Sequence, residues 1–517
     1  MRLLVLLIFM ISTANAQGFR LLEATINDVH TSFIAEEITC RELVELYLVR
    51  IEAYDKQGPQ LNAVQHLNAR ALEEADALDA AFSASGLVGP LHCVPVLLKD
   101  QVETSDMPTT YGSAVFSEFI SGRDATIVTR MKEAGAIILA KTTMGEFASR
   151  YLGSAFGIAR NAYDPARNPS GSSAGTGIGV AANFGLVGIG EDTGGSIRGP
   201  ASVHSLVGLR PTVPLVSRFG MMPANPTHDT LGPIARTVTD AAILLEVLAG
   251  YDSNDPMTAY SVGRVPENYQ GFLDQGGLRG ARIGVIRQSM DPGADPGSED
   301  FKKVRAVIDQ AFEDIASLGA ELVDPVEIPL LDIVHETYGN NNFETEQAIV
   351  DYLADLPGAP VSSLGEALLQ GEVVPWRASD LINVIGKSTL DAGYLEFMLT
   401  REEIRQSVLA FMADAQLDAL VYATFDHQTT LIASDALTNA NTEDAYGRGN
   451  NRRLSPLTAF PAITVPAGFT EDGLPIGIEI LGRAFSEGML LGFAYAYEQA
   501  TQHRQPPTTT PPLSVSP

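Results

Sequence analysis

Segments with helical periodicity alternate with short apolar runs in the first third of the chain. Residues 36–54, 69–82 and 125–134 carry apolar side chains three and four positions apart, which predicts amphipathic helices. Residues 94–98 and 136–139 are continuous apolar runs, which are typical of buried strands. Such alternation predicts a layered α/β fold around a largely parallel sheet.

The N-terminus has the composition of an export signal. Arg2 precedes nine consecutive apolar residues, 3–11, and Ala14-Asn15-Ala16 provides the small residues that signal peptidases require. A core helix or a membrane anchor is the alternative, but a bilayer core requires about 20 apolar residues. We therefore expect residues 1–16 to be a signal peptide, with a mature protein that starts at Gln17, has no membrane span and is secreted or periplasmic.

The charge balance narrows the classes of partner. The chain has 63 acidic and 34 basic residues and a formal net charge of −29. Nucleic acids and anionic membranes require basic patches, so neither is an expected partner. The eight histidines are scattered and the cysteines form no metal-binding motif, so no metal or cofactor is predicted. Cys40 and Cys93 form either one disulfide or two separate thiols.

Residues 168–200 combine ten glycines and four serines with regularly interleaved apolar residues. Glycine and serine richness alone is typical of flexible linkers. A linker would lack the apolar component, so we expect tight backbone packing around a site. In contrast, the Pro/Thr-rich residues 505–517 have little to bury, which predicts a disordered tail.

Two serine motifs lie within this glycine-rich segment. Residues 171–175, GSSAG, match the nucleophile-elbow pattern centred on Ser173, but a loop rather than a strand precedes them. Residues 192–198, DTGGSIR, follow a predicted strand at 186–189 and place Ser196 after two glycines. The backbone amides of residues 193–196 can converge on one point there, although an ordinary tight turn is equally compatible with this segment alone.

Three motifs together resemble the amidase signature family. Residues 89–100, GPLHCVPVLLKD, resemble its lysine strand, and residues 170–175 and 192–198 resemble its serine-rich signature. Further similarity lies at 135–142, 205–212, 229–233, 461–468 and 473–483. The resemblance covers most of residues 20–250 and 400–505. It implies a single three-layer α/β/α domain with a central mixed sheet over residues 17–504, in which 255–400 is a divergent region on the substrate side.

The resemblance also implies a role for each site residue. Ser196 is the expected nucleophile, Ser172, which follows a cis peptide bond in the family, is the expected proton relay, and Lys99 is the expected base. An apolar strand favours the neutral lysine that a base must be, because burial disfavours the charged form. The amides of Thr193, Gly194, Gly195 and Ser196 would form the oxyanion hole. Supporting roles outside the chemistry are expected for Asp100, Ser173, Asp192 and Arg198.

This sequence departs from the family pattern at four positions. Ser170, Ala174 and Cys93 stand where the family usually has glycine, and Thr143 where it usually has asparagine. None of these changes removes a catalytic atom, so they affect the expected shape of the pocket rather than the mechanism.

The resulting functional hypothesis is an exported amidase that cleaves a small-molecule amide through an acyl-enzyme. An esterase or carbamate hydrolase with the same three residues is the first alternative, and a secreted non-catalytic binding protein is the second. A glutaminase that works on charged tRNA shares these motifs, but the predicted signal peptide argues against it. Neither the substrate nor the oligomeric state follows from the sequence.

Overall fold

The computed structural model describes residues 19–441 and 448–513. The predicted signal peptide, 1–16, lies outside these residues. Within them, no helix is both long and apolar enough to cross a membrane.

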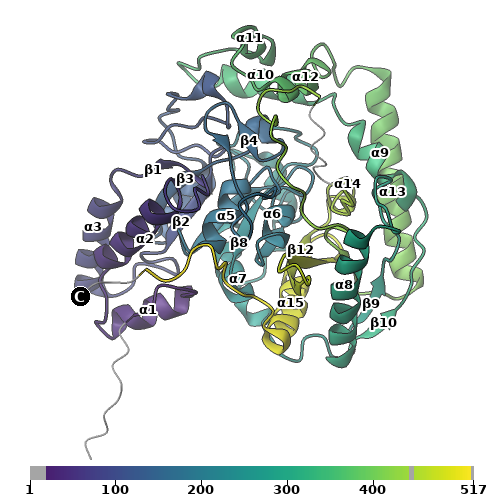
Figure 1. The fold of residues 1–517 in the computed structure, drawn as a ribbon, viewed down its shortest axis with the longest axis horizontal. Coiled ribbons are helices and arrows are strands. Elements are labelled where there is room, and N and C mark those ends of the chain that lie inside the picture. Colours follow the sequence, from purple (N-terminus) through teal and green to yellow (C-terminus); the bar gives the residue numbers. More distant parts are fainter. Residues whose placement is uncertain (1–18, 442–447, 514–517) are drawn as a thin grey trace, which may run out of the picture.

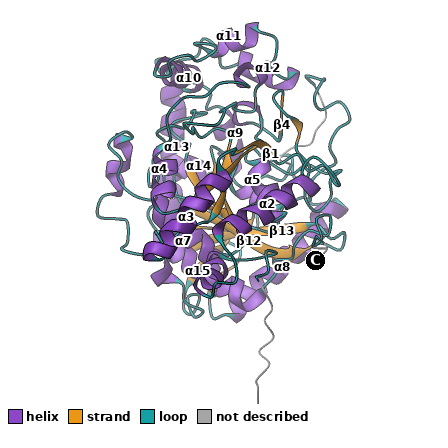
Figure 2. Cartoon of the chain, turned by 90° about the vertical axis from the view of Figure 1, so that its left-hand side faces the viewer, coloured by secondary structure: helices purple, strands orange, loops and turns teal. Residues whose placement is uncertain are grey.

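One large sheet forms the centre of the described chain, with helices around it (Figures 1 and 2). In spatial order its eleven strands are β1 (Val64–Leu67), β3 (Ile137–Thr142), β2 (Pro95–Lys99), β6 (Val187–Glu191), β8 (Leu231–Ala235), β7 (Val207–Arg210), β12 (Ala462–Phe469), β13 (Pro475–Leu481), β11 (Ala419–Ala423), β9 (Arg282–Val285) and β10 (Glu321–Val323). A separate ribbon pairs β4 (Leu152–Gly153) with β5 (Gly157–Ile158).

The sheet is mixed, as expected, but it is less parallel than expected. Parallel pairing joins β2 to β3 and β6, and β9 to β10 and β11. The other six neighbouring pairs are antiparallel. Parallel pairing requires a crossover of about a dozen or more residues. The short connection between β12 and β13 has no room for one, so this central pair is antiparallel.

Helices cover both faces of the sheet, which confirms the three-layer α/β/α architecture. The helices are α1 (Ile26–Ile34), α2 (Cys40–Tyr54), α3 (Ala71–Ser85), α4 (Thr126–Glu133), α5 (Ala174–Ala181), α6 (Arg198–Ser202), α7 (Val238–Leu248), α8 (Glu299–Ser317), α9 (Val334–Gly339), α10 (Thr345–Ala354), α11 (Leu364–Leu369), α12 (Pro375–Ile382), α13 (Ala392–Asp414), α14 (Leu454–Thr458) and α15 (Glu487–Thr501). On one face α4 contacts α7, α7 contacts α15, and α15 contacts α8. On the other face α5 contacts α6. Because α4 and α5 make crossovers in opposite directions along the sheet, right-handed connections place them on opposite faces.

The glycine-rich segment is part of the core and not a linker. Every residue from 168 to 200 is buried, and the segment forms α5, β6 and the start of α6. A Cβ on Gly175 would lie 2.3 Å from the Ala63 carbonyl oxygen, and one on Gly188 would lie 2.4 Å from Thr176 Cγ2. The glycines therefore allow neighbouring segments to approach more closely than any side chain would permit.

Helices α10–α12 form the top of the molecule in Figure 1. Their apolar side chains pack in one cluster with Tyr111, Phe116 and Phe147. The hydroxyls of Tyr111 and Tyr352 share a hydrogen bond of 2.7 Å. Part of the divergent 255–400 region thus packs against residues from the first third of the chain.

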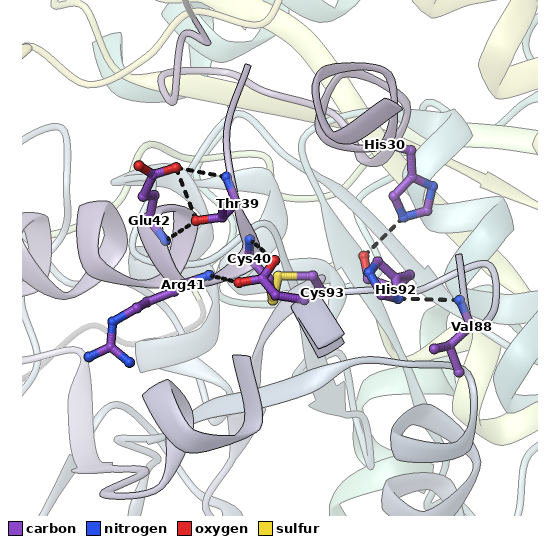
Figure 3. Close-up of a disulfide and its surroundings, with 9 residues drawn as sticks. His30, Thr39, Cys40, Arg41, Glu42, Val88, His92 and Cys93 are labelled. Carbon is purple, nitrogen blue, oxygen red and sulfur yellow. Dashed lines mark hydrogen bonds between the residues drawn. A yellow bond between two sulfur atoms is a disulfide. The ribbon is translucent and has the colours of Figure 1, made fainter. Parts of the chain in front are cut away.

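Cys40 and Cys93 form a disulfide, which resolves the alternative left open by the sequence (Figure 3). Cys40 is the first residue of α2, where Thr39 and Glu42 form a capping box. Cys93 lies just before β2 and has φ +55°. Glycine adopts this left-handed conformation readily, which accounts for the glycine usual at this position. Ser170, the second of the glycine replacements, has φ +60°.

The C-terminal segment was expected to be disordered, and that expectation is wrong for residues 505–513. The Arg50 side chain is buried and donates hydrogen bonds to the carbonyl oxygens of Thr510 and, at 2.9 Å, Pro511. Tyr54 Oη also donates to the Pro511 carbonyl, at 2.9 Å. The segment is held through its backbone carbonyls, which its Pro/Thr composition does not reveal.

Candidate active site

The site lies at the carboxyl ends of two neighbouring parallel strands. Lys99 is the last residue of β2 and Glu191 is the last residue of β6, and the two strands pair in parallel. Parallel strands end at the same edge of a sheet, where ligands bind in α/β proteins. The local fold thus brings the lysine and the glycine-rich loop that follows Glu191 together.

Lys99 is completely buried and contacts the expected relay residue. Its Nζ lies 2.8 Å from Ser172 Oγ, 2.6 Å from Glu191 Oε2 and 3.2 Å from the Glu191 carbonyl oxygen. Burial lowers the pKa of Lys99, and the Glu191 carboxylate opposes this shift without cancelling it. The lysine is therefore easier to deprotonate than an exposed one, as a base requires.

Ser172 follows a cis peptide bond, Gly171–Ser172, as the resemblance implied. Its side chain is fully buried, and its hydroxyl lies within hydrogen-bonding distance of Lys99 Nζ. The backbone carbonyl of Ser172 accepts a hydrogen bond of 3.0 Å from the Gly145 amide.

Ser196 lies beside this pair and at the wall of a cavity. The Ser196 carbonyl accepts a hydrogen bond of 3.3 Å from the amide of Ser173, the neighbour of Ser172. Ser196 is 9% exposed and lines a cavity of ≈ 240 Å³, together with Thr193 and Gly194. In the described residues no hydrogen bond joins the two serine hydroxyls directly, and such contacts often tighten only when substrate binds.

The expected oxyanion hole requires one correction. The Gly195 amide donates to Asp192 Oδ1 at 2.6 Å, so it is engaged within its own loop. Within the described chain, the amides of Thr193, Gly194 and Ser196 make no hydrogen bond, and these three residues line the cavity. The donors available to an oxyanion are therefore these three and not Gly195.

Asp192 and Arg198 brace the loop, in line with the role expected for them. Asp192 forms buried ion pairs with Arg198 Nε at 3.2 Å and with Arg210 Nη1 at 3.1 Å. Burial alone would raise the pKa of Asp192, but the guanidinium groups of Arg198 and Arg210 hold it far below its usual range. Asp192 therefore stays ionised and fixes the loop through the amides of Gly195 and Ile197.

Asp100 and Ser173 lie behind the site. Asp100 accepts a hydrogen bond from the Thr110 amide at 2.9 Å and lies 3.3 Å from Lys141 Nζ, and neither contact reaches the cavity. The buried Ser173 hydroxyl exchanges hydrogen bonds of 3.1 and 3.2 Å with the backbone of Glu191. The Ser173 hydroxyl is thus hydrogen-bonded to the backbone at the end of β6, which argues against Ser173 as the nucleophile of an elbow motif.

Glu191 was missed as a site residue in the sequence. Its carboxylate contacts Lys99 and also accepts a hydrogen bond of 2.6 Å from Thr193 Oγ1. The signal was an acidic residue at the end of an apolar strand, directly before the loop that carries Ser196. Nearby, burial and repulsion from Glu191 raise the pKa of Asp229 to about 8. In the part of the chain that the structure describes, no group of three or more His, Cys, Asp or Glu side chains is placed to hold a metal ion.

Comparison with known proteins decides the family. The profile of the family described as Amidase matches residues 42–491. A probable amidase of Arabidopsis thaliana is 33% identical over 95% of this chain and 92% of its own length. The chain belongs to the amidase signature family. It is accordingly an amidase-type hydrolase of carbon–nitrogen bonds, with the α/β fold and large mixed sheet of that family.

Other members of the amidase signature family extend this likeness. One component of the glutamyl-tRNA(Gln) amidotransferase of Rippkaea orientalis is 31% identical over 94% of this chain and 99% of its own length. Among solved structures, the peptide amidase of Stenotrophomonas maltophilia has a TM-score of 0.85 and 34% identity over 94% of this chain and 99% of its own. A bacterial aryl acylamidase has a TM-score of 0.76 and 26% identity over 92% and 96%.

Proposed function

We propose that this family member is an exported serine hydrolase that cleaves a carboxylic amide through an acyl-enzyme, with Ser196 as nucleophile, Ser172 as relay and Lys99 as base. The observation that carries the proposal is the buried contact of 2.8 Å between Lys99 Nζ and Ser172 Oγ, beside a cavity that Ser196 lines. Serine is a weak nucleophile unless a base removes its proton, and a buried lysine with a lowered pKa is suited to that task.

The proposed reaction has two steps. Ser196 Oγ attacks the amide carbon while its proton passes through Ser172 to neutral Lys99, and the three free amides bind the developing oxyanion. The carbon–nitrogen bond then breaks, and Lys99 returns the proton through Ser172 to the leaving amine. Water releases the acid from Ser196 by the same proton path in reverse, which regenerates the starting enzyme.

Partitioning of the acyl-enzyme tests this proposal. Two anilides that share an acyl group but differ in the amine are hydrolysed in the presence of hydroxylamine. A common acyl-enzyme gives the same ratio of hydroxamate to acid from both. Ratios that differ between the two anilides contradict the acyl-enzyme route. An ester with the same acyl group, run in parallel, measures the preference for amides over esters.

The proposal of export is supported by the N-terminal pattern and by the disulfide between Cys40 and Cys93, since disulfides persist in oxidising compartments. Mass spectrometry of protein from the native host is expected to show an N-terminus at Gln17 in the secreted or periplasmic fraction. Intact Met1 in the cytosol is the contrary result.

A further inference from the structure

The cavity at Ser196 has a charge opposite to that of the whole protein. Of the described residues that line it, three are arginines, Arg150, Arg377 and Arg453, and none is aspartate or glutamate. The full chain has 63 acidic residues against 34 basic ones. A random sample of this composition would favour carboxylates, so the clustering of guanidinium groups at the reaction centre calls for a physical reason.

The three side chains come from distant segments. Arg150 follows the short helix Glu146–Ala148, Arg377 belongs to α12, and Arg453 directly precedes α14. All three are half-buried. Among the described residues, no carboxylate oxygen lies within 4.0 Å of any of the three guanidinium groups, and Arg377 and Arg453 donate to backbone carbonyl oxygens. Partly desolvated cations without a counter-ion are costly, and an anion bound in the cavity would offset that cost.

Arg150 is the member best prepared to bind an anion. Its guanidinium lies 4.4 Å from the centre of the Trp376 ring, a cation–π contact that holds the group in place. Its Nη1 is buried and makes no hydrogen bond within the described chain. A planar guanidinium with an unpaired Nη1 is suited to bind a carboxylate.

Arg377 follows Trp376, and its hydrogen bonds go to backbone carbonyl oxygens. It donates to the carbonyl oxygens of Glu146 at 3.1 Å and Phe147 at 2.6 Å. Burial lowers the pKa of Arg377 to about 10, and the carboxylates of Asp380 and Glu146 oppose this shift only in part, so the group stays charged at neutral pH.

Arg453 differs because it is bound to the loop that carries the nucleophile. It donates to the Gly194 carbonyl and lies 4.0 Å from the centre of the Tyr338 ring. A Cβ on Gly194 would lie 1.8 Å from Arg453 Nη1, so the guanidinium rests directly against the loop. Arg453 therefore has a supporting task, whereas Arg150 and Arg377 have donors left for a ligand.

We propose that the enzyme selects amides that carry a carboxylate, and that Arg150 and Arg377 bind this carboxylate. The inference rests on the proposed function, because it takes the cavity at Ser196 as the substrate site. The cavity of ≈ 240 Å³ is small for a ligand pocket, which favours a short substrate with the carboxylate near the scissile bond.

Matched pairs of substrates test the selectivity. The mono-4-nitroanilide of succinic acid is compared with butyric acid 4-nitroanilide, and N-butyrylglycine with N-propylbutyramide. The first pair places the carboxylate on the acyl side, and the second places it on the amine side. Hydrogen bonds to charged groups predict a kcat/KM for the anionic member about 10- to 100-fold above its neutral partner in one pair.

The variants Arg150→Met and Arg377→Met are expected to lower that ratio by about tenfold each. Arg41→Met is the matched control, because Arg41 lies on the exposed face of α2, and it is expected to keep the wild-type ratio. A wild-type ratio near one in both pairs overturns the inference, as does a high ratio that survives both substitutions.

A binding measurement separates this inference from the proposed function. Isothermal titration of Ser196→Ala with succinate and with neutral succinamide requires no turnover. Binding of succinate, with loss of that binding in Ser196→Ala/Arg150→Met, supports the carboxylate site even if no amide is hydrolysed. Failure of succinate to bind, together with normal hydrolysis of neutral anilides, refutes the inference and leaves the proposed function in place.

Discussion

The contact between Glu191 and Lys99 predicts a shift in the pH dependence of catalysis. In the variant Glu191→Gln, the carboxylate that favours the charged lysine is replaced by a neutral group of the same shape. The pKa of Lys99 then falls further, because burial is no longer opposed. Neutral Lys99 is the active form and is present above its pKa, so the acid limb of kcat/KM is expected to move to lower pH.

The size of the shift follows from the geometry. Lys99 Nζ and Glu191 Oε2 are 2.6 Å apart, and their side chains are fully buried. Charge centres about 4 Å apart at an effective dielectric constant of about 20 interact by about 4 kcal/mol, or about three pKa units. Asp229 reduces this value. Its pKa, raised to about 8 by burial and by repulsion from Glu191, falls in the variant and restores some negative charge.

We therefore expect a shift of about one to three units in Glu191→Gln. The double variant Glu191→Gln/Asp229→Asn removes the compensation, and its shift is expected to be larger. Asp192, the third carboxylate near Lys99, remains paired with Arg198 and Arg210 in every variant and does not contribute to the difference.

The assay is kcat/KM between pH 5 and pH 10 with one anilide substrate, with melting temperatures as a check on folding. A folded, active variant whose acid limb stays at the wild-type pH would refute the coupling between Glu191 and the catalytic base. A shift to higher pH would contradict the sign of the argument.

Three further predictions concern the base, the disulfide and the C-terminal segment. Lys99→Ala is expected to lower kcat by at least roughly three orders of magnitude, with substrate binding largely retained. Single-turnover assays with enzyme in excess measure this loss, and near-normal turnover would contradict the assignment of Lys99 as the base. Cys40→Ser removes a cross-link between residues 53 positions apart and is expected to lower the free energy of unfolding by up to about 4 kcal/mol. A reductant is expected to produce the same loss in the wild type and no further loss in the variant. Truncation after Arg504 removes the two carbonyl acceptors, Thr510 and Pro511, of the buried Arg50 guanidinium. It is expected to lower the free energy of unfolding in urea by about 1–3 kcal/mol, and an unchanged midpoint would contradict the anchoring of the C-terminal segment by Arg50.

Local elements could be predicted from the sequence because their signals are local. The apolar run at 94–98 predicted a strand ending at Lys99, and β2 is Pro95–Lys99. The glycines of residues 168–200 predicted close packing because only a backbone without side chains can approach Ala63 or Thr176 as closely as this one does.

Features that depend on distant contacts could not be predicted in the same way. The antiparallel centre of the sheet depends on which strands become neighbours, and the hydrophobic pattern of a buried strand does not specify its direction. The order of residues 505–513 depends on the Arg50 side chain, more than 450 positions away. The Gly195 amide was expected at the oxyanion hole, but its direction is set by the Asp192 side chain. Arg150, Arg377 and Arg453 meet only in the folded chain.

The identity of the nucleophile is the central claim, and covalent labelling tests it most directly. A fluorophosphonate probe reacts with an activated serine, and peptide mapping identifies the residue that carries it. Ser196 is expected to carry the label in the wild type, and Ser196→Ala is expected to abolish labelling. Ser172→Ala is expected to slow labelling without changing its position, because Ser172 only transfers a proton, and combining it with Lys99→Ala is expected to add little.

Ser173 is the internal control, because the nucleophile-elbow pattern would assign the label to it. Its hydroxyl is fully buried and hydrogen-bonded to the backbone of Glu191, so Ser173 is expected to stay unmodified. A label on Ser196 that disappears in Ser196→Ala is the predicted result, and a label on Ser173 contradicts the account.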